Sequence, residues 1–301
     1  MQDKKKYTTF IVTALTLCIL GWYVYQQVFS IPGGFPVGKQ FTVNENESLK
    51  SISERLAIEG YINTPTLFRT GISFFGKDKN IQLGGYIFNS PQPLFNIIEI
   101  FVRGQPKTPL LSVTIPEGST LLEVSEIVTK AIPSISVNDF NKLVLDTNAN
   151  GKLFPSTYFL LPSYTGSDIL KVMLSAFTKK AENLILNSDI PQPLAGVEDV
   201  IILASLVEGE AKGENDMKLV SGVLLSRLSK GMPLQVDVAR ETYRRKGLPA
   251  SPINNPGLVA INAVLHPTVT DYVYYITGND GQMYYAKTFE EHKKNIKKYL
   301  K

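Results

Sequence analysis

The sequence is poor in the residues that bind metals or carry redox chemistry. Its 301 residues include one cysteine, Cys18, and two histidines, His266 and His292. One cysteine cannot form a disulfide within the chain, and so few thiol and imidazole groups do not make a Cys/His metal site. We therefore expect an enzyme or binding protein that needs no metal and no cofactor.

The sequence also has little excess of charge of either sign. The 31 basic and 27 acidic residues give a net charge of +4, and Lys4, Lys5 and Lys6 against Asp3 supply two of these charges. The remainder is nearly neutral, whereas nucleic-acid-binding proteins carry basic patches, so no nucleic-acid partner is expected. With 44% hydrophobic and 19% charged residues, the composition is that of a globular protein.

The segment from Tyr7 to Gly38 has no charged residue, and Thr8–Tyr25 within it is mostly apolar. Its 18 residues would span ~27 Å as a helix, close to the thickness of a membrane core. Basic residues flank transmembrane helices on the cytoplasmic side, so the lysine cluster predicts a single-pass anchor with the amino end inside. A cleaved signal peptide is the alternative, although no small-x-small cleavage pattern follows.

A repeat is visible in the first half of the sequence. Residues 41–43 favour a strand and residues 48–60 a helix, and the same pattern returns 72 residues later without a gap. This predicts an internal duplication; the alternative is a chance alignment of two amphipathic helices. The coinciding pairs are Val43/Ile115, Glu45/Glu117, Leu49/Leu121, Ile52/Val124, Leu56/Val128 and Phe68/Phe140.

The second half mixes helices with strands that do not strictly alternate, which predicts an α+β fold. Two β-prone runs, 271–277 and 282–286, flank the sequence GNDG and predict a hairpin. Helices are expected over 167–186, 197–211, 215–229 and 257–265.

Glu208 is the most unusual acidic residue. It lies in the helical sequence VIILASLVEGEA, on the same face as Ile201 and Ala204. An apolar setting raises the pKa of a carboxyl group, as a proton donor near neutral pH requires. The alternative is a glutamate at a helix end that pairs with Lys212 or Arg227, and Glu210 is open to the same two interpretations.

Motifs between residues 151 and 292 occur in the order found in the endolytic murein transglycosylase family (MltG/YceG-like), which this sequence resembles. The first half resembles the family's single membrane anchor and LysM-like module. The motifs are GKLFPSTYF (151–159), LASLVEGEA (203–211), Arg227–Leu228, GMPLQ (231–235), Asp237, Thr242–Tyr243, Gly247–Pro249, INNPG (253–257), His266–Pro267, Asp271–Tyr275 and Glu291–His292.

The resemblance implies cleavage of peptidoglycan strands at the MurNAc–GlcNAc bond with formation of 1,6-anhydro ends. Glu208 matches the family's catalytic glutamate. One carboxyl group suffices if the 6-hydroxyl of the sugar is the nucleophile, whereas most glycosidases need two. Candidate substrate contacts are Glu210, Gln235, Asp237 and Tyr243, for each of which a structural role is the alternative.

The resemblance also implies an organisation and a location. We expect a cytoplasmic tail and anchor over 1–30, a linker and LysM-like βα module over 31–110, and a mixed helix/strand catalytic domain over 111–301. The protein would sit in the bacterial cytoplasmic membrane with its catalytic domain outside. Peptidoglycan strands and the membrane are the expected partners, with cell-wall synthases as further ones.

The sequence departs from the family near the expected site. The segment 238–241 (VARE) is short, Glu241 stands where the family has Asn, Ser226 replaces another Asn and Met283 replaces a His. These changes motivate an alternative, a non-catalytic or weakly active peptidoglycan-binding scaffold. A hydrolase that uses water, with Asp237 as second carboxylate, is a third hypothesis.

Overall fold

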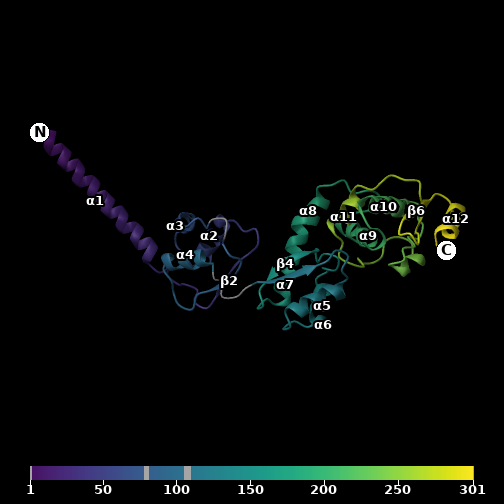
Figure 1. Cartoon of the computed structure of the whole chain (residues 1–301), viewed down its shortest axis with the longest axis horizontal. Helices are drawn as coiled ribbons and strands as arrows, with labels where there is room; N and C mark the ends of the chain where they lie inside the picture. The colour runs from purple at the N-terminus through teal and green to yellow at the C-terminus, as the bar shows by residue number, and fades with distance from the viewer. Residues whose placement is uncertain (1, 78–80, 105–109, 301) are drawn as a thin grey trace. The chain divides into compact units, whose positions relative to one another are not determined.

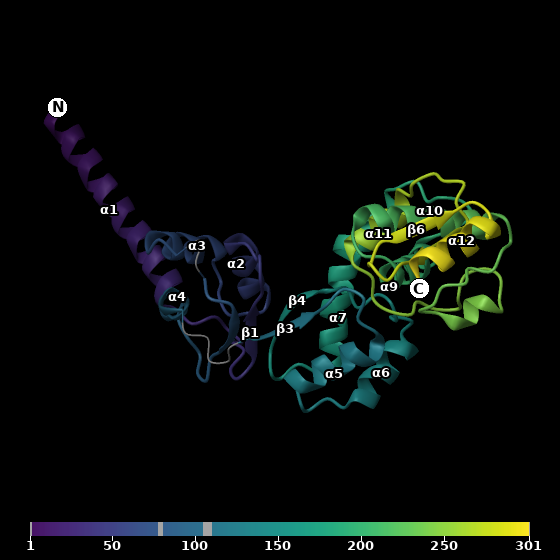
Figure 2. The same ribbon diagram turned by 45° about the vertical axis from the view of Figure 1, so that its right-hand side comes forward.

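The computed structural model describes residues 2–77, 81–104 and 110–300. Contacts divide the chain into two compact units, Met1–Leu111 and Ser112–Lys301, and each is described by itself. Helices and short strands are mixed in both units (Figures 1 and 2), and each sheet in the described residues has two strands. The mixed helix and strand content agrees with the expected α+β class.

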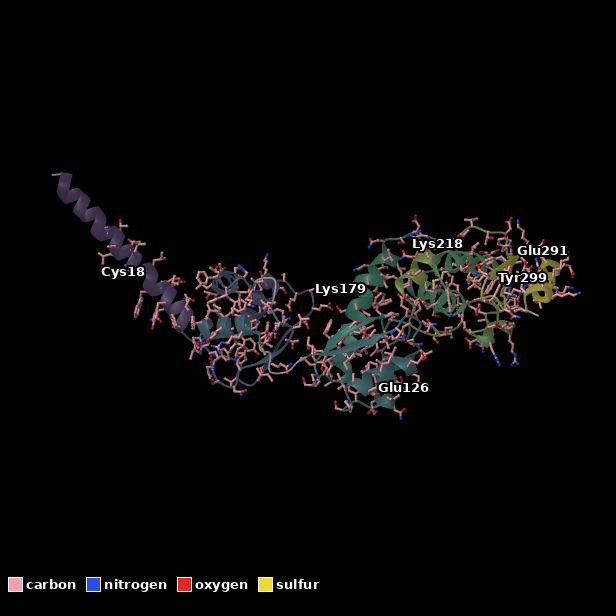
Figure 3. All side chains as sticks on the ribbon, viewed as in Figure 1. Cys18, Glu126, Lys179, Lys218, Glu291 and Tyr299 are labelled. Atoms are coloured by element: carbon pink, nitrogen blue, oxygen red, sulfur yellow. The ribbon has the colours of Figure 1, made fainter. Side chains whose placement is uncertain are left out.

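The first unit begins with the long helix α1 (Gln2–Phe29). Its stretch Val12–Phe29 is long and apolar enough to cross a membrane, and none of it is buried within the protein. Cys18 lies exposed on this helix (Figure 3), and Phe29 at its end stacks on Phe95 with ring centres 5.6 Å apart. A membrane anchor is compatible with these features; the side chains of Lys4–Lys6 lie outside the described residues.

The rest of the first unit is a βααβα module around an aromatic core. Its two strands pair antiparallel with Phe41 opposite Tyr86, and Tyr86 stacks on Phe101 with ring centres 4.2 Å apart. The predicted strand at 41–43 and helix at 48–60 are confirmed, while the likeness to a LysM module stays a prediction. The elements are β1 (Gln40–Val43), α2 (Leu49–Ile58), α3 (Pro65–Phe74), β2 (Gly84–Ile87) and α4 (Leu94–Arg103).

The second unit opens with the same five elements in the same order. Each of the last four begins 72 residues after its counterpart: 121 − 49, 137 − 65, 156 − 84 and 166 − 94 all equal 72. The duplication is therefore confirmed, and it extends further than the sequence comparison indicated. The elements are β3 (Leu111–Ile115), α5 (Leu121–Ala131), α6 (Val137–Asp146), β4 (Ser156–Leu160) and α7 (Gly166–Phe177).

Equivalent residues of the two copies also have equivalent environments. Ser53 and Ser125 are fully buried, and each donates its hydroxyl to a backbone carbonyl one turn earlier in its helix. Asn46 and Gly118, in the turn between the first strand and helix, both have a left-handed φ, of 59° and 73°. Two unrelated amphipathic helices would not share such turn and hydrogen-bond details, so the chance alignment is excluded.

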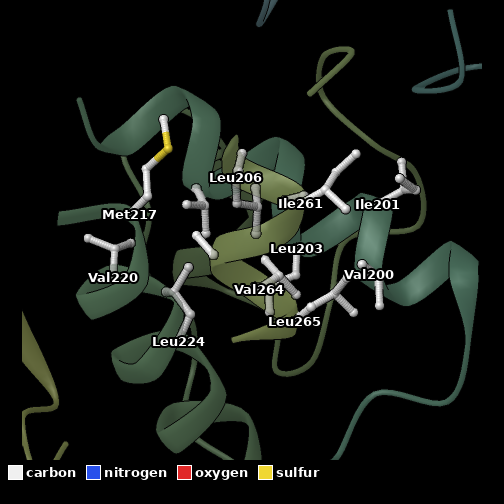
Figure 4. Close-up of a cluster of buried hydrophobic side chains, with 14 of the residues drawn as sticks. Val200, Ile201, Leu203, Leu206, Met217, Val220, Leu224, Ile261, Val264 and Leu265 are labelled. Carbon is white, nitrogen blue, oxygen red and sulfur yellow. The ribbon is translucent and has the colours of Figure 1, made fainter. Parts of the chain in front are cut away.

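Three helices form the core that follows the second copy. The predicted helix over 167–186 is α7, then a turn of π-helix (Thr178–Glu182), then α8 (Asn183–Leu186). Apolar side chains of three further helices interdigitate (Figure 4), and those of the central one from Val200 to Val207 are all buried. The three are α9 (Val197–Glu210), α10 (Glu214–Ser229) and α11 (Leu258–Leu265), as predicted to within a few residues.

A hairpin and a terminal helix complete the second unit. The strands β5 (Tyr274–Thr277) and β6 (Met283–Ala286) pair antiparallel across the predicted GNDG turn. The predicted strand over 271–277 begins only at Tyr274; before it, the Tyr272 N–H bonds to Thr270 Oγ1 instead of a partner strand. Helix α12 (Phe289–Tyr299) follows, with a capping box at Thr288 and Glu291.

Candidate active site

The last turn of α9 carries both glutamates that the sequence singled out. Residues two apart on a helix point ~200° apart, so Glu208 and Glu210 face opposite sides. Gly209 between them is exposed and has Val238 as a neighbour, whose Cγ1 would lie 3.1 Å from a Cβ at position 209. The carboxylates of Glu208 and Glu210 therefore contact different parts of the protein.

Glu208 is half-buried under a turn of the second repeat copy and the segment before α11. Its Oε2 accepts the backbone N–H of Gly257 at 2.9 Å. A Cβ at Gly118 would lie 3.3 Å from Glu208 Cγ, so the two residues are in close contact. Burial raises the pKa of Glu208, the Gly257 hydrogen bond partly opposes this, and the nearby charge of Glu117 raises it further.

The segment 252–257 holds this site together. Asn255 and the turn at 118–119 exchange backbone hydrogen bonds at 2.9 Å, from Gly118 N–H to Asn255 O and from Asn255 N–H to Ser119 O. Asn255 is fully buried, and its side chain accepts the Leu153 N–H at 2.8 Å. Asn254 donates to Ser205 O of α9 at 2.9 Å. The INNPG motif (253–257) thus connects helix α9, which carries Glu208, to the second repeat copy.

Glu210 points to the side of α9 opposite to Glu208. Its two oxygens accept the Val238 N–H at 3.2 Å and the Tyr275 hydroxyl at 3.3 Å. Burial, the largest cause, and the charge of Asp237 raise the pKa of Glu210, while the hydrogen bond from Val238 lowers it. This carboxyl group is therefore also a candidate proton carrier.

The four predicted substrate contacts line one cavity of about 400 Å³. Gln235 has a left-handed φ of 51°, which an L-residue adopts only when its surroundings impose it. Tyr243 donates its hydroxyl to Asp237 Oδ1 at 2.5 Å, which raises the pKa of Tyr243 to about 12. The structure brings Glu210, Gln235, Asp237 and Tyr243 together, while Glu208 does not line this cavity.

Arg227 also borders the cavity, and it is structural. Its guanidinium is buried and donates to the carbonyls of Val273, at 2.6 Å, and Leu234. It lies 5.5 Å from the ring centre of Tyr274. Because its hydrogen bonds go to backbone, the alternative in which Arg227 pairs with Glu208 is wrong.

The two histidines do not act as a pair. His266 is exposed and ends α11, where its backbone N–H bonds to Asn262 O at 2.8 Å. His292 stacks on Tyr274 with ring centres 5.1 Å apart and borders the cavity. His266 thus lies at a helix end and His292 packs against an aromatic ring. In the described residues, no group of three or more His, Cys, Asp or Glu side chains could hold a metal ion.

Sequence reasoning missed two contributors to the site. Tyr275 was part of a recognised motif, but its hydrogen bond to Glu210 comes from a strand paired far from that helix in sequence. Glu117 was noticed only as one of the coinciding repeat positions. Its local sequence, Pro116–Glu117–Gly118, is that of a turn and gave no sign that Glu117 lies beside Glu208.

The chain belongs to the YceG-like family, whose model matches residues 41–241 and 240–298. The endolytic murein transglycosylase of Bacillus subtilis is 27% identical over 86% of this chain and 85% of its own length. A protein of that name from Streptococcus pneumoniae R6 is 26% identical over 97% of this chain, which spans 64% of that relative. A crystal structure of a yceG-like protein from Listeria monocytogenes shares the fold, with a TM-score of 0.53, 23% identity and coverage of 85% and 98% of the two chains.

Proposed function

We propose that this protein is a membrane-anchored lytic transglycosylase that cleaves peptidoglycan strands at the MurNAc–GlcNAc bond. The observation that carries the proposal is the half-buried Glu208, whose pKa is raised mainly by burial and whose Oε2 is held by the Gly257 N–H. The relatives named endolytic murein transglycosylase support this reaction class.

The proposed reaction uses one carboxyl group twice. Protonated Glu208 donates its proton to the glycosidic oxygen as the bond from C1 of MurNAc to that oxygen breaks. The 6-hydroxyl oxygen of the same MurNAc then bonds to C1, and its proton passes to the Glu208 carboxylate. A 1,6-anhydro end and a free GlcNAc hydroxyl result, and Glu208 regains its starting protonation state.

The cavity beside Glu210 would bind the strand next to the reacting bond. Glu210, Gln235 and Asp237 offer polar atoms for sugar hydroxyls, and the exposed ring of Tyr243 offers a face for stacking. Since Glu208 lies on the other side of α9, these residues serve binding rather than proton transfer in this proposal.

The remaining parts of the chain would place the enzyme at its substrate. Helix α1 would anchor residues 1–30 in the bacterial cytoplasmic membrane with the amino end inside, and residues 111–301 would act outside. The first βααβα module, within residues 31–110, would bind glycan in the manner of a LysM module. Cell-wall synthases are proposed partners on the strength of the shared substrate.

The test is digestion of purified peptidoglycan by the full-length protein in detergent, with analysis of the released muropeptides. The wild type should release fragments with anhydro ends, and Glu208→Gln should lose about 10²–10⁴-fold in rate. Gln keeps the shape and still accepts the Gly257 N–H, so melting temperature should not fall. Release of anhydro ends by Glu208→Gln at the wild-type rate would contradict the assignment.

Two other outcomes would support the remaining hypotheses. Reducing ends in place of anhydro ends indicate a hydrolase that uses water. Asp237, the second carboxylate of that hypothesis, lies with Glu210 and bonds Tyr243, so it is poorly placed to serve Glu208. Binding of strands without any cleavage indicates a scaffold, which the short 238–241 segment motivates.

A further inference from the structure

The turn after β3 places a second carboxylate beside Glu208. A Cβ on Gly257 would lie 2.2 Å from Glu117 Oε1, so the Glu117 carboxylate rests against the residue whose N–H binds Glu208. The turn is held there by the paired hydrogen bonds between residues 118–119 and Asn255. The backbone that carries Glu117 is therefore held against the segment that binds Glu208, and both carboxylates lie against Gly257.

The repeat shows that this turn is adapted to Glu208. At the equivalent turn of the first copy, Asn46 takes the place of Gly118, and both have a left-handed φ. Asn tolerates that conformation, so the backbone alone does not require glycine in the second copy. In the second copy Glu208 approaches this turn, and its Cγ would lie 3.3 Å from a Cβ at 118, so a side chain there would push Glu208 by a few tenths of an ångström. Glu45 and Glu117 occupy equivalent positions, and Glu117 lies beside the half-buried carboxyl group of Glu208.

We propose that Glu117 is a positioning residue that acts through Glu208, as the negatively charged neighbour that favours its proton-bearing form. The inference rests on the proposed function for its effect on catalysis. Two carboxylates close together in a partly dehydrated site do not both ionise readily. Glu117 is exposed and Glu208 half-buried, so burial disfavours the charged form of Glu208, the group that begins the reaction with a proton.

The other charged groups nearby do not replace this effect. The segment 252–257 carries no charge, and on α9 itself Glu210 faces the opposite side. The groove beside Glu117 is lined further along α5 by Glu123, Glu126 and Lys130 (Glu126 is labelled in Figure 3). Glu123 is engaged in the cap of α5, where it accepts the Thr120 N–H at 2.7 Å. Among the described residues, Glu117 is the charge that acts on the Glu208 carboxyl group.

The first experiment measures Glu208 itself. Carbon-13 carboxyl labelling of glutamate in the full chain, in detergent, lets its titration be followed by NMR, with Glu208→Gln used to assign the signal. In Glu117→Gln the midpoint of Glu208 should move to lower pH, because the like charge is gone. An unchanged midpoint overturns the proposal whether or not the protein cleaves peptidoglycan.

The second experiment is the pH profile of strand cleavage. Loss of activity on the alkaline side reports deprotonation of the acid, so Glu117→Gln should shift that limb to lower pH and leave the acidic plateau unchanged. Glu117→Asp keeps the charge and should largely restore the profile. If the wild type cleaves nothing, the proposed function fails, while the titration still decides the role of Glu117.

Matched controls separate charge from structure. Glu45→Gln makes the same change at the equivalent position of the first copy, and Glu126→Gln makes it in the same groove; neither should shift the Glu208 midpoint. Gly257→Ala should displace the Glu117 carboxylate without removing its charge and shift the midpoint in the same direction as Glu117→Gln. Equal loss of activity at every pH in Glu117→Gln, with the midpoint unmoved, would mark Glu117 as a reacting or purely structural group and refute the positioning role.

Discussion

Tyr86 and Tyr158 stand 72 residues apart and make the same hydrogen bond. Each is buried in the second strand of its repeat copy, and each donates its hydroxyl to the carbonyl four residues earlier, of Gln82 and Phe154. Burial raises the pKa of Tyr86 to about 12 and that of Tyr158 further. The two copies thus preserve a buried polar contact as well as their apolar cores.

We expect Tyr86→Phe and Tyr158→Phe to destabilise the protein by a similar amount. Each removes one buried hydrogen bond and leaves a carbonyl without its partner, at a cost of about 1 kcal/mol. Urea unfolding of both variants, followed by circular dichroism, measures the change. A neutral effect for one variant and a large one for the other would show that the copies no longer use this contact alike.

The stability of the protein should depend on Glu208 through pH. Its folded-state pKa is raised by burial above the ordinary value of 4.5, so folding is penalised when Glu208 is ionised. This penalty is absent at pH values below the pKa of Glu208 in the unfolded chain, and it is complete at pH values above its pKa in the folded protein. Glu208→Gln should therefore melt higher than wild type at neutral pH and equally below about pH 4. Thermal unfolding across this range tests it, with the exposed Glu126→Gln as control; a constant difference at all pH values would contradict the prediction.

Glu210→Gln should impair substrate binding more than chemistry. Glu210 shares its cavity with Gln235, Asp237 and Tyr243 and faces away from Glu208. We expect a higher KM with a loss of kcat smaller than that of Glu208→Gln, measured on peptidoglycan strands of defined length. A Glu210→Gln variant that is inactive at saturating substrate, beside an active Glu208→Gln, would transfer the catalytic role to Glu210.

The topology can be tested with a fusion after Lys301. The lysines before the apolar helix predict that the amino end stays inside. An alkaline phosphatase fusion, which is active only outside the cytoplasm, should show activity, whereas a cytoplasm-only fluorescent fusion should not. The reverse pattern would place the second unit inside and remove it from peptidoglycan.

Much of the fold could be predicted because short stretches of sequence specify many of its helices and turns. The apolar run of α9, the Asn-Pro sequence before α11 and the GNDG turn between β5 and β6 each have short-range patterns. The repeat was visible from six coinciding positions. The later elements β2, α4, β4 and α7 of the two copies were not paired, because they share only a few identical residues, among them Tyr86 and Tyr158, and otherwise agree in burial and spacing.

The candidate site was predictable in its residues but not in its grouping. The sequence placed Glu208 and its four candidate contacts in one expected site, whereas the structure puts Glu208 on one side of α9 and the four contacts on the other. Residues two apart on a helix point to opposite sides, so Glu208 and Glu210 enter separate sites once other parts of the chain pack on both sides of α9. Glu208 accepts the Gly257 N–H on one side, and Glu210 accepts the Val238 N–H and the Tyr275 hydroxyl on the other.

The sequence by itself determined the apolar first helix, the duplicated module and the glutamate on an apolar helix, because each depends on residues close together in the chain. Only the tertiary structure decided what surrounds that glutamate. The Gly257 N–H and the Glu117 carboxylate reach Glu208 through hydrogen bonds between a repeat turn and the segment before α11. Contacts between such distant segments depend on how the helices pack, and no local pattern encodes them.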